Sequence, residues 1–366
     1  MSGISANFGC NMYYSSSPDS YKSENDTQTS LLVERPARHG FSANGEYLLE
    51  TQNWHELEDL VSVNKIAIQT LPQPDKEIYL LSSTEIHVAS MWAFRGQFKL
   101  ALSSLLTAHS LKQAENPVDL PNTCWIEDNL ATIYGCLGDF DIAVKWAERS
   151  RATWRAWSES SGAEFQCPPL LKLTHGRILL YAGRLDEARS LLNEALDGLL
   201  NAVPFVWAPA ATCKFTIGRL LMYQGDYNNA ESMLLECQSI WLQGDKSRAL
   251  DFNGIIEYHL GCCALMQGNV DAALDHLKEA TVISSIHKDT HPAKYARCRF
   301  KLSEALRQAH GQEAEADLEL ANARALYLEI VSKTCPTPEG PAEFPIKPLD
   351  QVHEKDFDSL IHISQR

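Results

Sequence analysis

The sequence predicts an all-α solenoid of about seven helical hairpins, and three observations predict it. The pattern Gly-Arg-x-Leu-x-Tyr-x-Gly, followed five residues later by Ala, begins at Gly176 and again 42 residues later at Gly218. A glycine recurs at intervals of 42 to 45 residues, at Gly96, Gly138, Gly183, Gly225, Gly268 and Gly311. Small residues flank most of these glycines, seven positions before and five positions after. Self-similarity at such a period is typical of repeats that each form one supersecondary unit and stack on their neighbours.

Each repeat predicts two helices joined at the glycine. The first helix is expected to end there, because glycine readily adopts the left-handed conformation that closes a helix. Asp139, Asp226 and Asn269 follow their glycines directly and are expected to cap the second helix. The small residues, such as Gly176 and Ala188, would let the two helices approach closely. A seventh unit is expected upstream, where Gln52 takes the place of the glycine.

These positions resemble the tetratricopeptide repeat family: a small residue within the first helix, then Gly-x-aromatic at the turn and Ala three residues on. The resemblance covers about residues 38 to 325 and implies a right-handed superhelix. The family period is about 34 residues, and the longer period here resembles kinesin light chains and the repeat arrays of fungal NLR-type receptors. His291-Pro292 and Lys301 to Ala309 favour the fungal type. The extra residues are expected in the second helices or in connections near 115–122 and 158–169.

The two ends of the chain differ from the repeats. Residues 1–37 are rich in Ser, Asn, Asp and Tyr without periodic apolar positions, which predicts a disordered segment. Residues 38–331 form the predicted repeat domain, and residues 332–366 a Pro-rich tail in which five prolines from 336 to 348 exclude a regular helix. Within that tail, 350–363 is compatible either with one short docked helix or strand or with no docking.

Composition restricts the partners. A net charge of −15 argues against nucleic acid and against an anionic membrane surface, since both attract basic patches. No apolar run approaches the roughly 18 residues that span a bilayer. A basic segment followed by an apolar core, which would suggest secretion, is not seen at the start of the sequence. The ten cysteines are scattered, as expected for reduced thiols. We therefore expect a cytoplasmic protein, with the nucleus as an alternative.

The resemblance also implies which side chains face the concave groove: those thirteen, ten, six and three residues before each turn glycine. These positions include Trp125, Asp128, Arg177, Phe215, Arg219 and Tyr258. The two arginines are expected to stand side by side and to bind carboxylates or a phosphate, with the three aromatic residues as apolar anchors. In the alternative, each arginine pairs with a helix acid such as Asp128 and only keeps the groove polar.

Other clusters have structural explanations. His287 and His291 have the spacing of metal ligands on a helix, but Pro292 and a predicted connection argue against a site, and we predict no metal and no cofactor. The face that carries Trp146, Trp154 and Trp157 is expected to pack on the connection to the next repeat, with a partner-binding patch as the alternative. Tyr181 and Tyr223 recur two residues before their turns, where a structural role is expected.

No nucleophile elbow, HExxH motif, phosphate loop or carboxylate pair is present, which favours a protein that is not an enzyme. The leading hypothesis is an interaction scaffold or adaptor that binds a peptide or protein partner in its concave groove. An alternative is an accessory or catalytic protein of a fungal specialised-metabolite pathway that holds a small molecule there. A signalling protein without its nucleotide-binding half is a third possibility, because the motif GxxxxGK[ST] is absent.

Overall fold

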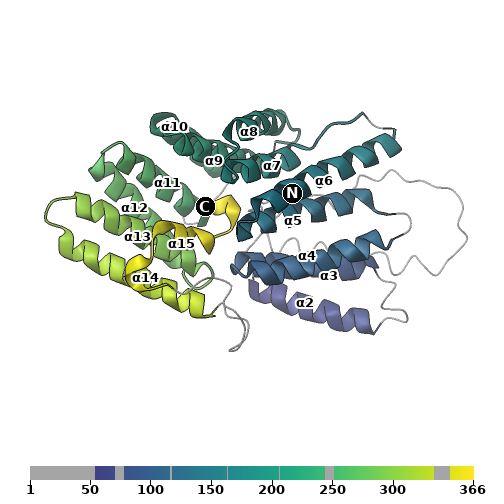
Figure 1. The fold of residues 1–366 in the computed structure, drawn as a ribbon, viewed down its shortest axis with the longest axis horizontal. Helices are drawn as coiled ribbons and strands as arrows, with labels where there is room; N and C mark the ends of the chain where they lie inside the picture. The colour runs from purple at the N-terminus through teal and green to yellow at the C-terminus, as the bar shows by residue number, and fades with distance from the viewer. Residues whose placement is uncertain are drawn as a thin grey trace, which may run out of the picture.

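The chain folds into a curved array of paired helices (Figure 1). The structure, a computed structural model, describes residues 54–70, 78–115, 118–162, 164–205, 207–243, 251–333 and 347–366. Every regular element in these residues is a helix. Two predictions, the disordered segment 1–37 and the first turn at Gln52, lie outside them.

Consecutive helices pack as antiparallel hairpins, as the repeat predicts. The pairs are α3 (Ile78–Phe94) with α4 (Phe98–Gln113), α5 (Leu120–Leu137) with α6 (Phe140–Ser160), α7 (Pro169–Tyr181) with α8 (Leu185–Leu200), α9 (Trp207–Tyr223) with α10 (Tyr227–Gln243), α11 (Asp251–Met266) with α12 (Val270–Ile286), and α13 (Pro292–Gln308) with α14 (Glu313–Lys333). Before them, α2 (Trp54–Gln69) packs on α3 and follows the predicted first turn. After them come the 3₁₀ turn η2 (Leu349–Gln351), the short helix α15 (Glu354–Ser359) and the 3₁₀ turn η3 (Ile363–Gln365).

The turn glycines have the predicted conformation. All six have positive φ, from 74° at Gly96 to 87° at Gly138. Capping follows in part: the Asn269 side chain accepts a hydrogen bond from the Ala272 amide at 3.3 Å, and Asp226 accepts one from the Asn229 amide at the same distance. The predicted cap at Asp139 is wrong. The Ile142 amide, which the side chain was expected to accept, donates instead to the backbone carbonyl of Asp139 at 3.1 Å, and no side-chain bond forms.

The small residues allow the close helix contacts that the sequence predicts. A Cβ atom at Gly176 would lie 2.8 Å from Leu192 Cγ, and one at Gly261 would lie 2.6 Å from Leu277 Cγ. Both distances are shorter than real side chains tolerate. The first helix of each of these repeats therefore packs its backbone directly against the second.

In the repeat α5–α6, the extra residues lie in the 21-residue helix α6 and in the segment that connects it to α7. The Trp154 Nε1 donates a hydrogen bond to the Gln166 carbonyl at 3.0 Å, and the Arg155 guanidinium lies 4.6 Å from the Phe165 ring centroid. The predicted packing of this tryptophan on the connection is confirmed. Trp146 differs, because it contacts the ring of His109 on the preceding hairpin at 5.2 Å.

The array curves until its first and last described hairpins meet. The Phe94 ring, at the end of α3, packs edge-on against His291, just before α13, at 6.4 Å. One buried apolar cluster contains side chains of α3 to α5, of α13 and α14 and of the C-terminal segment. None of the described helices combines the length and apolar character needed to cross a bilayer.

Candidate functional site

Residues 347–366, which we call the docked tail, turn back into the array. Helix α15 packs on α13, and η3 packs on α5. In Figure 1 this yellow segment lies in the middle of the molecule, between α13 and the blue helix α5. Residues 360 to 366 are all buried. Of the two alternatives that the sequence left for 350–363, the docked short helix is the one observed.

Two carboxylates hold the start of the docked tail. Glu354 accepts hydrogen bonds from the Tyr258 hydroxyl and from the Lys301 ammonium group. Asp358 accepts one from Arg297 Nη1 at 2.8 Å. The Arg297 guanidinium is 1% exposed and lies 4.2 Å from the Tyr258 ring centroid. Acids one helical turn apart therefore point at a buried arginine, a lysine and a phenol.

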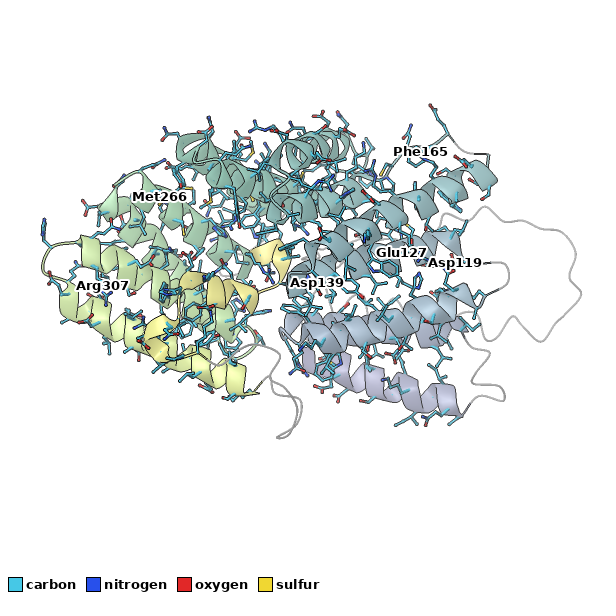
Figure 2. The ribbon with its side chains drawn as sticks, viewed as in Figure 1. Asp119, Glu127, Asp139, Phe165, Met266 and Arg307 are labelled. Atoms are coloured by element: carbon cyan, nitrogen blue, oxygen red, sulfur yellow. The ribbon has the colours of Figure 1, made fainter. Side chains whose placement is uncertain are left out.

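The end of the docked tail is held mainly through backbone groups. Arg297 Nη2 donates to the Gln365 carbonyl at 3.1 Å, and the Tyr181 hydroxyl donates to the Arg366 carbonyl at 3.1 Å. In return, Arg366 Nη2 donates to the Cys136 carbonyl at 2.5 Å. That carbonyl is among the last four of α5, which have no partner within the helix, so a cation is favourable there. Figure 2 shows the turn at Asp139, just beyond α5, beside this segment.

Apolar contacts also hold the docked tail. The Phe357 side chain is fully buried, and its ring packs against Phe300 at 5.3 Å and Tyr327 at 5.5 Å. The Ile363 side chain lies so close to Gly135 that a Cβ there would be 2.8 Å from its Cδ1 atom. The inner surface thus accommodates both charged and apolar side chains of the docked tail.

Two buried titratable groups where the docked tail meets the inner helices keep one ionisation state. Burial, followed by Arg177 and Arg366, lowers the pKa of His362 to about 3, so this imidazole is neutral at neutral pH. Burial, followed by Cys262 and Glu354, raises the pKa of Tyr258 well above its usual value, so its hydroxyl stays a donor.

A cavity of about 350 Å³ lies beside the start of the docked tail. Its lining includes Arg219, Tyr223, Cys262, Lys301 and Glu354. With Glu304, which also lines it, the cavity combines two basic groups, two acids and apolar surface on α9, α11 and α13.

Two segments of the chain match the tetratricopeptide repeat family, residues 128–156 and residues 211–240. The first falls on the hairpin α5–α6 and the second on α9–α10. The chain contains tetratricopeptide repeats. No curated protein matches its sequence.

Solved structures share the tetratricopeptide repeat fold at low identity. A Rap protein complexed with competence and sporulation factor is 12% identical, covers 85% of this chain and 82% of its own, and has a TM-score of 0.59. NprR in complex with its cognate peptide NprX is 11% identical, covers 78% and 76%, and has a TM-score of 0.57. A putative kinesin light chain with TPR-like repeats from Podosopora anserina is 17% identical, covers 59% and 97%, and has a TM-score of 0.44. At these identities the likeness is one of fold.

The structure brings three of the predicted groove residues, Arg219, Phe215 and Tyr258, together around His259. Arg219 Nη1 lies 2.7 Å from the His259 Nδ1 atom. The rings of Phe215 and Tyr258 lie 5.1 Å and 4.9 Å from that imidazole. Of the three, Tyr258 bonds to the docked tail directly.

The other predicted residues form two separate groups. Arg177 is 4% exposed, and its charge interacts with Tyr181 and Asp128. It also lies near His362 of the docked tail. Trp125, at 6% exposed, packs in an apolar cluster with Leu171 and with Trp154, whose ring centroid is 6.1 Å away.

Sequence reasoning missed Arg297, Lys301, Cys136 and the tail contact of Tyr181. Lys301 stands ten residues before Gly311, so the family offsets would have identified it had they been applied to the last repeat. Arg297 lies one position outside these offsets. Cys136 acts through its backbone carbonyl, for which a sequence carries no signal.

Proposed function

We propose that this protein is an interaction adaptor that binds a peptide, or a peptide-like segment of a partner protein, on the concave surface of its repeat array. One observation carries the proposal: the inner helices already hold a peptide segment, residues 354–366, through paired carboxylates, backbone carbonyls and a fitted isoleucine. A surface that satisfies backbone carbonyls and side chains alike is suited to extended or short helical ligands.

The structures of similar fold support the same class of ligand. NprR was solved in complex with its cognate peptide NprX, and the Rap protein in complex with competence and sporulation factor. Their identity to this chain is too low for residue roles to carry over. The proposal therefore depends on the chemistry of the inner surface, in which Arg177, Arg219, Phe215 and Tyr258 are the proposed binding residues.

The test is a displayed peptide library selected on the immobilised protein, followed by calorimetry of the selected peptides. Hydrogen bonds to charged groups contribute about 1.5–3 kcal/mol, so we expect Arg177→Ala and Arg219→Ala each to weaken binding at least tenfold. Arg184→Ala is the matched control, because Arg184 pairs with Glu187 on the exposed turn before α8. Selected peptides that bind all three variants equally would place the binding surface elsewhere.

A second candidate function is favoured by the cavity beside Arg219. Its volume of about 350 Å³ lies within the range of small-molecule sites, roughly 300–1,000 Å³. In this alternative the protein holds a small molecule of a biosynthetic pathway, as an accessory or catalytic component. A ligand that binds only the folded state raises the melting temperature. A shift produced by a metabolite fraction without any protein partner, and abolished in Arg219→Ala, would support this candidate over the adaptor.

A further inference from the structure

The docked tail is polar where a permanent core would be apolar. His362, Ser364, Gln365 and Arg366 are all 8% exposed or less. Side chains of these types are rarely buried unless they are paired. His362 and Ser364 bond to each other, while Gln365 and Arg366 bond to separate groups on inner helices, such as the Cys136 carbonyl on α5 and the Tyr181 hydroxyl on α7. This combination is typical of a bound peptide.

The docked tail also leaves donors of the inner surface unmet. The Nε atoms of Arg177, Arg219 and Arg297 are buried and have no hydrogen-bond partner among the described residues. Arg177 and Arg297 themselves are only 4% and 1% exposed. A buried donor without an acceptor costs free energy that a better occupant recovers. The tail is therefore a suboptimal ligand for this surface.

The mismatch is greatest around Arg177. The tail residue whose charge state Arg177 influences is His362, and its buried imidazole supplies no negative charge. A carboxylate at this position would instead be attracted by Arg177. By contrast, at Arg297 the tail already supplies a carboxylate, that of Asp358.

We propose that residues 354–366 are an internal ligand that occupies the groove and competes with a partner for it. The partner is an acidic peptide segment that displaces these residues and pairs its carboxylates with Arg177 and Arg219. This inference rests on the proposed function, because it names the partner and the regulation of the same surface. The partner would carry an acid equivalent to Asp358, which binds Arg297, and a further acid at the position of His362.

The tether makes the internal ligand a strong competitor. Thirteen residues, 334–346, connect α14 to the docked tail, and short tethers give effective concentrations on the order of millimolar. The apparent affinity for a partner falls by the fraction of molecules in which the groove is open. Weakening the tail without changing the groove should therefore strengthen partner binding.

The experiment uses the full chain and two fluorescent peptides: residues 354–366, and the same peptide with His362→Glu. Anisotropy titrations compare the unmodified protein with Asp358→Arg/Ile363→Asp, which loosens the tail, and with Asp350→Arg. Asp350 has an exposed side chain, so this variant repeats the Asp→Arg substitution of the loosened variant away from the groups that hold residues 354–366. We expect the loosened variant to bind both peptides at least tenfold tighter than the other two proteins. The His362→Glu peptide should bind tighter than the parent peptide.

Equal affinities in all three proteins would overturn the internal ligand, while binding itself would leave the proposed function intact. If neither peptide binds the loosened variant but library peptides do, the acidic partner is wrong and the adaptor stands. If the loosened variant loses its helical circular dichroism, the tail is an integral part of the fold and the proposal is overturned.

A second measurement needs no variant. Excess His362→Glu peptide added to the unmodified protein should speed hydrogen exchange at residues 356–366 at least tenfold. The amides of α8, which lies away from the tail, should be unaffected. Unchanged exchange in the tail at saturating peptide would contradict displacement.

Discussion

Gly261 shows how a single hydrogen atom sets the distance between the two helices of a repeat. A methyl group there would meet Leu277 Cγ at 2.6 Å and Cδ2 at 2.9 Å. We expect Gly261→Ala to destabilise the fold by about 1–3 kcal/mol, the usual cost of overpacking a core, measured by urea unfolding. Lys278→Ala, an exposed change beside Leu277, is the control and should cost less than about 0.5 kcal/mol. Equal stability of the two variants would show that the helices separate easily.

Such glycines were predictable because a repeat forces the same geometry at each occurrence. The resemblance to the family also implied which helix positions face the groove, and that assignment stays a prediction. The sequence could not indicate what these positions meet, since the contacts of Tyr258 and Arg297 lie 96 and 61 residues away in the docked tail. The cap at Asp139 failed for a related reason. A capping side chain competes with backbone acceptors whose positions only the three-dimensional structure fixes.

Asp251 and Lys294 form a buried ion pair between α11 and α13, 3% and 6% exposed. Burial alone would raise the pKa of Asp251, but Lys294 and His291 lower it to about 2. Asp251→Asn would leave the ammonium group buried without its counter-charge, which typically costs about 3–5 kcal/mol. We expect chemical denaturation to show this loss, and the double variant Asp251→Asn/Lys294→Met to recover most of it. Additive losses in the double variant would mean that the two groups do not act as a pair.

At the scale of elements, α15 is a helix of six residues, Glu354–Ser359. Isolated helices shorter than about 12 residues are marginal in water, so α15 depends on its contacts with α13. The sequence left its docking open because those contacts have no local pattern. Prolines precede it, and the groups that hold it are spread over α11, α13 and α14.

Phe357→Ala tests whether the docked tail is a separate unit of stability. Truncating a fully buried phenylalanine costs about 3–5 kcal/mol in a single cooperative core. If the tail detaches first, the loss is limited to the free energy of docking, and only local protection changes. We expect hydrogen exchange to rise at residues 356–366 while the amides of α7 to α10 keep their rates. A uniform rise over all helices would instead show that the tail unfolds only with the whole molecule.

At the scale of the molecule, the docked tail connects parts of the array that its repeat pattern does not connect. A solenoid repeat contacts only its neighbours, yet here one apolar cluster joins the first and last described hairpins. The tail provides the bridge, with Ile363 beside Gly135 on α5 and Phe357 against Phe300 on α13. The repeats could be predicted because their contacts are local in sequence. The closure could not, because it depends on a segment without a repeat.

Buried neutral histidines make the stability of the whole molecule depend on pH. The group consists of His87, His175, His259, His291 and His362, all 6% exposed or less. Burial is the largest cause in each case: it lowers the pKa of His87 and His175 to about 4 and that of His291 and His362 to about 3, and that of His259 falls well below its usual value. In the unfolded chain these groups take up protons near pH 6.5.

Because the pKa values of these histidines are lowered in the folded state, acid decreases the free energy of unfolding. Stability from these histidines is complete above pH 6.5 and is lost as the pH falls toward 4, because the unfolded state binds more protons. At pH 5.5 each contributes a loss of about 1.4 kcal/mol, and five such losses approach the total stability of a typical domain, about 5–15 kcal/mol. His276 has the opposite sign, since a hydrogen bond with Glu257 raises its pKa. One such group does not offset five.

We therefore expect urea denaturation to give a much lower free energy of unfolding at pH 5.5 than at pH 7.5. His87 Nδ1 has no hydrogen-bond partner among the described residues, so His87→Met removes one titrating group without breaking a bond at that atom. The pH slope of this variant should fall by about one proton, or about 1.4 kcal/mol per pH unit. Lys278→Ala should keep the full slope. A free energy of unfolding that is the same at both pH values would mean that these imidazoles take up protons in the folded state.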